Sequence, residues 1–171
     1  ERKKELVAYH EAGHAIVGAL MPDYDPVAKV SIIPRGQAGG LTFFTPSEER
    51  LESGLYSRSY LQNQMAVALG GRVAEEIVFG DVTNGASGDI RQATSLARRM
   101  VCEWGMSEEL GMVEYGEARE EVFLARDISK PKNYSEETAK KIDAEIRRII
   151  DSAYADAKKM LTENRDKLEL I

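Results

Sequence analysis

Cysteine and histidine are scarce in this sequence of 171 residues, which contains one cysteine and two histidines. A single cysteine excludes a disulfide within the chain, and it also excludes a zinc site built from several thiolates. The scarcity fits a reducing compartment. Because Cys102 lies in an apolar run with helical spacing, we expect it to be a buried packing residue rather than a reactive thiol.

Several other features are missing. There is no run of about 18 apolar residues, so we expect no transmembrane helix within the sequence. The net charge of −6 offers no basic surface for nucleic acid. A phosphate loop of the form Gly-x-x-x-x-Gly-Lys-Ser/Thr does not occur, so we expect no ATP hydrolysis. The sequence has no signal peptide and does not begin with Met, and we expect it to be a piece of a longer protein.

The first part of the sequence predicts a helix followed by a β-hairpin. Apolar residues recur with helical spacing over Glu5–Leu20, and Pro22 stops this helix. Two runs with the composition of strands follow at Val27–Ile33 and Leu41–Thr45, and each is ended by proline. These runs predict a hairpin or small sheet in which at least one edge is not continued within the chain.

The middle of the sequence predicts helices. An apolar stripe over Tyr60–Leu69 predicts a helix that Gly70 and Gly71 interrupt. The helix is expected to resume over Arg72–Phe79, with Gly80 as its C-cap.

Two further helices are expected downstream. Ser87 is expected to cap a helix that runs to about Trp104, and Ser135 is expected to open a long C-terminal helix. The segment Gly105–Pro131 between them is predicted to be irregular. The predicted buried stripes are Ile90, Ala93, Ala97 and Val101 in the first helix and Ile142, Ile146, Ile149, Ala153, Ala157 and Met160 in the second. The sequence thus predicts a mainly α fold with a small β-hairpin and a long C-terminal helix.

Both histidines lie in the segment HEAGH at residues 10–14, which has the His-Glu-x-x-His pattern. Positions four apart share one face of a helix, so His10 and His14 can point at one ion. Zinc binds neutral imidazole well, and two histidines with one carboxylate leave a fourth position open for water. Glu11 is then placed to take a proton from that water.

The third ligand of such a site must be a carboxylate, because the chain offers no third histidine and only one cysteine. Asp89 is one candidate, in the first turn of a predicted helix, although an acid also stabilises a helix start by itself. Glu75 and Glu76 are the other candidates, on a second helix as in thermolysin. Spacing does not choose between these residues.

Four segments carry a resemblance to a known family. In chain order they are HEAGHA at 10–15, VSIIPRG at 30–36, LGGRVAEE at 69–76 and GASGDI at 85–90. They closely resemble the FtsH family (peptidase family M41) of membrane-anchored, ATP-dependent zinc metalloproteases, and the match covers nearly the whole chain. The resemblance implies that residues 1–171 form a single helical zinc metalloprotease domain.

The resemblance also implies roles for individual residues. His10 and His14 would bind one zinc ion per chain, and Glu11 would be the general base. The Asp of the Gly-Ala-Ser-x-Asp segment falls on Asp89, which would be the third ligand.

Supporting roles follow from the same resemblance. Glu75 and Glu76 would be structural groups near the site or groups behind the ligands. The strand expected to hold substrate comprises Leu41, Thr42, Phe43, Phe44 and Thr45.

For the whole protein, the resemblance implies a larger assembly. An AAA ATPase domain and membrane anchors would precede this sequence, and ATP would act only through that ATPase domain. The full-length protein would form a homo-hexamer that degrades unfolded or damaged membrane and soluble proteins in protein quality control. It would lie in the inner (plasma) membrane of a bacterium, with this domain facing the cytoplasm, rather than in an organelle membrane.

A non-catalytic function is the alternative hypothesis, namely an oligomeric assembly module with a structural or vestigial metal site. The complete His-Glu-x-x-His set argues against it, since a structural zinc would need a closed fourth position. With no further histidine in the chain, the sequence leaves the group that stabilises the oxyanion unassigned.

Overall fold

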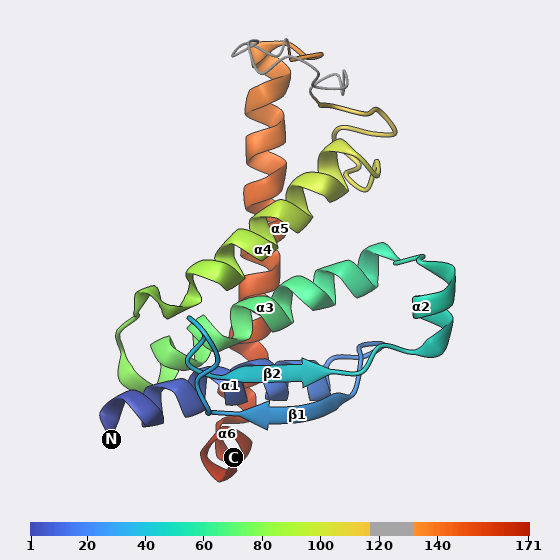
Figure 1. Cartoon of the computed structure of the whole chain (residues 1–171). Coiled ribbons are helices and arrows are strands. Elements are labelled where there is room, and N and C mark those ends of the chain that lie inside the picture. Colours follow the sequence, from blue (N-terminus) through green and yellow to red (C-terminus); the bar gives the residue numbers. More distant parts are fainter. Residues whose placement is uncertain (117–131) are drawn as a thin grey trace.

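The computed structural model describes residues 1–116 and 132–171 and is mainly helical (Figure 1). Its elements are α1 (Arg2–Leu20), β1 (Val27–Ser31), β2 (Leu41–Phe44), α2 (Glu48–Ser53), α3 (Arg58–Phe79), the 3-10 turn η1 (Asn84–Ala86), α4 (Ser87–Cys102), α5 (Glu136–Glu163) and α6 (Arg165–Leu170). This confirms the predicted mainly α fold. Of the segment Gly105–Pro131 predicted to be irregular, residues 117–131 lie outside the described residues. None of the described helices is long and apolar enough to span a membrane.

Helix α3 lies at the centre of the fold and contacts α1, α4 and α5. In Figure 1 the long helix α5 crosses α4, α3 and α1 in turn. The predicted stripe of α5 is buried from Ile142 to Ala157, and Met160 is partly buried. Cys102 is buried as predicted, and burial raises the pKa of its thiol. Within the described part of the chain, the buried apolar side chains form one core around α3.

Two glycines let α1 and α3 approach until their backbones touch. A Cβ on Gly13 would collide with the carbonyl oxygen of Gly70, and a Cβ on Gly70 would lie 2.9 Å from the carbonyl oxygen of Gly13. The predicted interruption at Gly70 and Gly71 was wrong, because α3 is continuous from Arg58 to Phe79. Packing of its buried face outweighs the low helix propensity of glycine.

The helix ends agree only in part with the expected capping residues. Ser135 caps α5 by accepting a hydrogen bond from the backbone N–H of Thr138, and Gly80 ends α3 in the left-handed conformation, both as predicted. The capping role of Ser87 was wrong. Ser87 is the first residue of α4, which starts without a side-chain cap, because the chain enters α4 through the turn η1. Thr83 caps that turn instead, by accepting from the backbone N–H of Gly85.

Helix α4 also begins its buried stripe later than predicted. Ile90 is 41% exposed, whereas Ala93, Ala97 and Val101 are buried. Consecutive helix positions are about 100° apart. Because Asp89 faces α1, the neighbouring Ile90 turns outward. Helix α4 ends at Cys102 rather than at Trp104.

The antiparallel hairpin of β1 and β2 confirms the predicted small sheet and packs on α1 (Figure 1). Its strands stop at Ser31 and Phe44, slightly short of the predicted ends. Asp25, just before β1, is 3% exposed and accepts hydrogen bonds from Arg50 of α2 and Tyr60 of α3. A buried carboxylate with both partners thus ties the hairpin to the helical core.

The close approach of α1 and α3 predicts that Gly13→Ala lowers the melting temperature. Overpacking at such a site costs about 1–3 kcal/mol, or roughly 2–4 °C per kcal/mol in a domain of this size. Gly88→Ala is the matched control, because a Cβ at Gly88 meets no atom within 4 Å. Thermal unfolding followed by circular dichroism should show a loss for Gly13→Ala and none for Gly88→Ala. Equal melting temperatures for the two variants would contradict this packing.

Candidate metal centre

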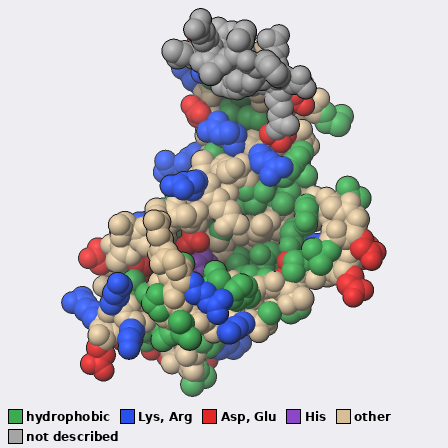
Figure 2. Space-filling model, in the orientation of Figure 1, with side chains coloured by type: hydrophobic (Ala, Val, Ile, Leu, Met, Phe, Trp, Pro, Cys, Tyr) green, Lys and Arg blue, Asp and Glu red, His purple; other side chains and the backbone are tan. Residues whose placement is uncertain are grey.

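The imidazoles of His10 and His14 lie side by side on one face of α1. Their Nε2 atoms are 3.1 Å apart, and the two side chains are 12% and 10% exposed. In Figure 2 histidine reaches this face of the molecule as a small area next to acidic atoms. The one-turn spacing in the sequence therefore brings the two nitrogens together, as the helix geometry predicts.

Helix α3 fixes the orientation of both rings through their Nδ1 atoms. His10 Nδ1 lies 2.9 Å from Glu75 Oε2, and His14 Nδ1 lies 2.6 Å from the carbonyl oxygen of Val67. Because both partners accept hydrogen bonds, each Nδ1 carries the hydrogen. Each neutral ring then presents an unshared electron pair on Nε2. Partners of this kind raise the basicity of a metal-binding imidazole.

Gly71 makes room for the ring of His10 on the surface of α3. A Cβ at position 71 would lie 2.5 Å from His10 Nε2. Gly70 and Gly71, which the sequence predicts to interrupt the helix, thus each allow a close contact with α1. Gly70 admits the backbone of α1, and Gly71 admits an imidazole.

Asp89 completes the group from the first turn of α4. Its Oδ2 atom lies 3.0 Å from His10 Nε2 and 3.4 Å from His14 Nε2. A tetrahedral zinc site with bonds of about 2.0–2.1 Å separates its ligand atoms by roughly 3.3 Å. The three distances of 3.0, 3.1 and 3.4 Å fit such a site. Among the described residues, His10, His14 and Asp89 form the cluster that could hold a metal ion.

The Nε2 atoms of His10 and His14 and the Oδ2 atom of Asp89 together favour a bound cation. Two Nε2 lone pairs and a carboxylate oxygen are all acceptors, so they repel one another unless a positive charge lies among them. Burial opposes protonation of His10, but hydrogen bonds to Asp89 and Glu75 outweigh it and raise the pKa of His10. Burial likewise opposes ionisation of Asp89, yet hydrogen bonds from His10 and His14 hold its pKa far below the usual range.

The other two carboxylates that the sequence left open as third ligands lie elsewhere. Glu75 is fully buried between His10 and Thr83, whose hydroxyl donates to its Oε1 atom over 2.6 Å. Glu76 points away and accepts a hydrogen bond from Tyr154 of α5. Glu75 therefore lies behind a candidate ligand, and Glu76 links two helices. No sequence pattern indicates the role of the Val67 carbonyl, because every residue has a backbone carbonyl.

Glu11 follows His10 on α1 and is 8% exposed. The hydroxyl of Thr42 in β2 lies 2.7 Å from Glu11 Oε2 and 3.0 Å from the carbonyl oxygen of Glu11. The hairpin therefore touches the helix at the glutamate of the His-Glu-x-x-His motif. The sequence predicts Thr42 in a substrate strand and carries no signal for this contact.

The model of peptidase family M41 matches residues 1–171 of the chain. The chain belongs to peptidase family M41. This confirms the resemblance to FtsH-type zinc metalloproteases that the four sequence segments indicated.

Similar proteins within this family come from cyanobacteria and plants. The chain is 64% identical over 171 residues to the ATP-dependent zinc metalloprotease FtsH 3 of Synechocystis, covering 99% of this chain and 28% of that protein. It is also 64% identical over 168 residues to the chloroplastic ATP-dependent zinc metalloprotease FTSH 5 of Arabidopsis thaliana, covering 97% of this chain and 24% of that protein. The chain thus spans about a quarter of the length of these relatives.

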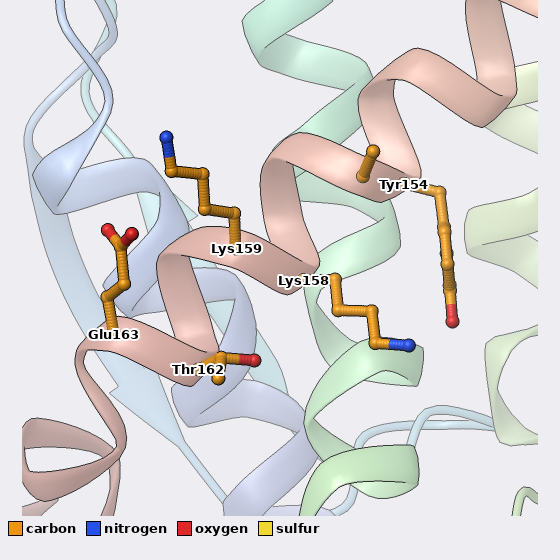
Figure 3. Close-up of a pocket in the computed structure, with 6 residues that line it drawn as sticks. Tyr154, Lys158, Lys159, Thr162 and Glu163 are labelled. Atoms are coloured by element: carbon orange, nitrogen blue, oxygen red, sulfur yellow. The ribbon is translucent and has the colours of Figure 1, made fainter.

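A hollow on the surface of α5, away from the histidines, is lined by Tyr154, Ala155, Lys158, Lys159, Thr162 and Glu163 (Figure 3). All of these residues come from one helix, and Lys158 and Lys159 point in different directions. None belongs to the histidine cluster. The residues that could hold a metal ion lie instead on α1 and α4.

The geometry predicts an order of zinc affinities for three variants. Asp89→Asn removes the charge of a candidate ligand and should weaken zinc binding by on the order of a hundredfold or more. Glu75→Gln loses the acceptor that orients His10 and should weaken it roughly 10–100-fold. Glu76→Gln is the matched control, because its carboxylate faces Tyr154.

Competition titration with a zinc chelator measures these affinities. The expected order of loss is Asp89→Asn, then Glu75→Gln, with Glu76→Gln close to the unmodified protein. A loss for Glu76→Gln as large as that for Asp89→Asn would contradict the assignment.

Proposed function

We propose that this chain is a zinc-dependent endopeptidase domain, with His10, His14 and Asp89 as zinc ligands and Glu11 as general base. The observation that carries the proposal is the convergence of three acceptor atoms at the spacing of a tetrahedral metal site, next to a glutamate on the same helix. Membership of family M41 supports the same reaction. Three protein ligands leave a fourth position for water or substrate.

Different residues of the site have different roles in peptide hydrolysis. A zinc ion in this site would supply Lewis-acid polarisation of the scissile carbonyl and lower the pKa of a bound water. The Glu11 carboxylate accepts a proton from the attacking water and then passes it to the leaving amine. Glu75 and the carbonyl of Val67 hold the rings of His10 and His14 with Nε2 toward the site.

We further propose that an unfolded polypeptide binds along the hairpin. Within residues 1–116 and 132–171, β2 pairs with β1 and with no other strand. An extended peptide can add to a free sheet edge through backbone hydrogen bonds, which requires little side-chain specificity. Contact between Thr42 and Glu11 brings this strand beside the proposed general base.

The larger assembly is also a proposal. The relatives are about four times as long as the chain and are named ATP-dependent, so we propose that an ATPase domain and membrane anchors belong to the same protein. In this view residues 1–171 are one protease domain of a homo-hexamer, and ATP acts through the ATPase domain. One relative at 64% identity is cyanobacterial and another is chloroplastic. We therefore propose a membrane protease and do not assign it to a bacterial or an organelle membrane.

The general-base role predicts that Glu11→Gln abolishes peptide cleavage while zinc stays bound. Loss of a general base lowers kcat by on the order of 10²–10⁴-fold, and Glu11 is not among the proposed ligands. Glu5→Gln is the matched control, since Glu5 lies exposed in the first turn of the same helix. Cleavage of an unstructured casein-like substrate and zinc content are measured on the same preparations.

Two outcomes would count against the proposal. Normal turnover by Glu11→Gln would exclude the general-base role. A zinc-saturated unmodified protein with no peptidase activity toward short unstructured peptides would favour the non-catalytic assembly module instead.

A further inference from the structure

The carboxylate of Glu11 is held by the hairpin rather than by its own helix. Glu11 as a whole residue is 8% exposed, and the hydrogen bond to its carboxylate within the described residues comes from the hydroxyl of Thr42, 2.7 Å from Oε2. A buried carboxylate without a donor is costly, so this bond selects one position for the side chain.

The residue two positions before Thr42 confines Glu11 from another direction. A Cβ on Gly40 would lie 2.8 Å from Glu11 Cγ and 2.8 Å from Val7 Cγ1. The backbone at Gly40 therefore packs directly on the stem of the glutamate. Gly40 and Thr42 together restrict the stem and the carboxylate of the same side chain.

We propose that Thr42 is a positioning residue that holds Glu11 in place to receive a proton, an inference that rests on the proposed peptidase function. Two acceptors lie within reach of the one hydroxyl hydrogen, namely Glu11 Oε2 at 2.7 Å and the carbonyl oxygen of Glu11 at 3.0 Å. While Glu11 is ionised, the hydroxyl donates to the carboxylate. Once Glu11 carries the proton, the hydroxyl turns its hydrogen to the carbonyl and its oxygen accepts from the carboxyl group. Thr42 thus keeps its hydrogen bonds in both states.

This role changes what β2 contributes to the site. Alternate residues of a strand share one face, so Thr42 and Phe44 both face α1. A Cβ on Gly18 of α1 would collide with the ring of Phe44, which confirms that this face is occupied by the helix. The side chain of Phe43 is 39% exposed on the other face. Phe43 and the unpaired backbone edge of β2 are therefore available to a peptide, whereas the side chains of Thr42 and Phe44 contact α1.

The test compares Thr42→Val, which keeps the shape but lacks the hydroxyl, with Thr42→Ser, which keeps the hydroxyl. Both are made in the complete zinc-loaded protease and assayed with a short unstructured fluorogenic peptide. We expect Thr42→Val to lower kcat by on the order of tenfold to a hundredfold with KM and zinc content unchanged, and Thr42→Ser to restore most of kcat. In a Glu11→Gln background, Thr42→Val should cause no further loss.

Contradicting results are distinct from failure of the proposed function. If the unmodified protease cleaves the peptide and Thr42→Val keeps its kcat, the positioning role is wrong while the peptidase stands. Equal losses for Thr42→Val and Thr42→Ser would also overturn it, because the hydroxyl would then not matter. A crystal structure of zinc-loaded Thr42→Val tests the inference even without turnover. The Glu11 carboxylate should leave its position, and an unchanged position would refute the role.

Discussion

The backbones of α1 and α3 meet at Gly13 and Gly70, where neither helix has a Cβ to hold the other away. This contact determines how closely the histidines of α1 approach α3. With the helices in contact here, His10 Nδ1 lies 2.9 Å from Glu75 Oε2 and His14 Nδ1 lies 2.6 Å from the carbonyl oxygen of Val67. Because of this close crossing, α3 fixes the orientation of both imidazole rings, and with it the direction of each Nε2 atom. An added methyl group at either position would therefore destabilise the fold.

Once both Nδ1 atoms have acceptors, the electrostatics of the centre follow. The imidazole Nε2 atoms and the Asp89 carboxylate face one another as acceptors, so the group is complete only with a positive charge. Asp89 lies in the first turn of α4, which the chain enters through η1, a turn that Thr83 caps while the same hydroxyl donates to Glu75. One threonine therefore links the loop that delivers Asp89 to the carboxylate that orients His10. In the proposed enzyme, a second threonine links the hairpin to the general base.

The sequence predicted those parts that depend on local spacing. Helix α1, the hairpin and the cap at Ser135 follow from periodicity and composition, and the pairing of the histidines follows from their separation of four residues. The errors occurred where packing between distant segments decided the outcome. Gly70 has low helix propensity, yet it lies within an unbroken helix because the backbone of α1 packs directly against it. Spacing could not choose between Asp89 and the α3 glutamates, since that choice depends on the path of the chain through η1.

In the proposed metal centre, α1 and α4, but not α3, supply the metal ligands. A crystal structure of the zinc-loaded protein, with anomalous scattering recorded at the zinc edge, measures this directly. We expect one peak at about 2.0–2.2 Å from His10 Nε2, His14 Nε2 and a carboxylate oxygen of Asp89, with the Glu75 carboxylate still on His10 Nδ1. A peak bonded to Glu75, or one away from the two histidines, would contradict the account.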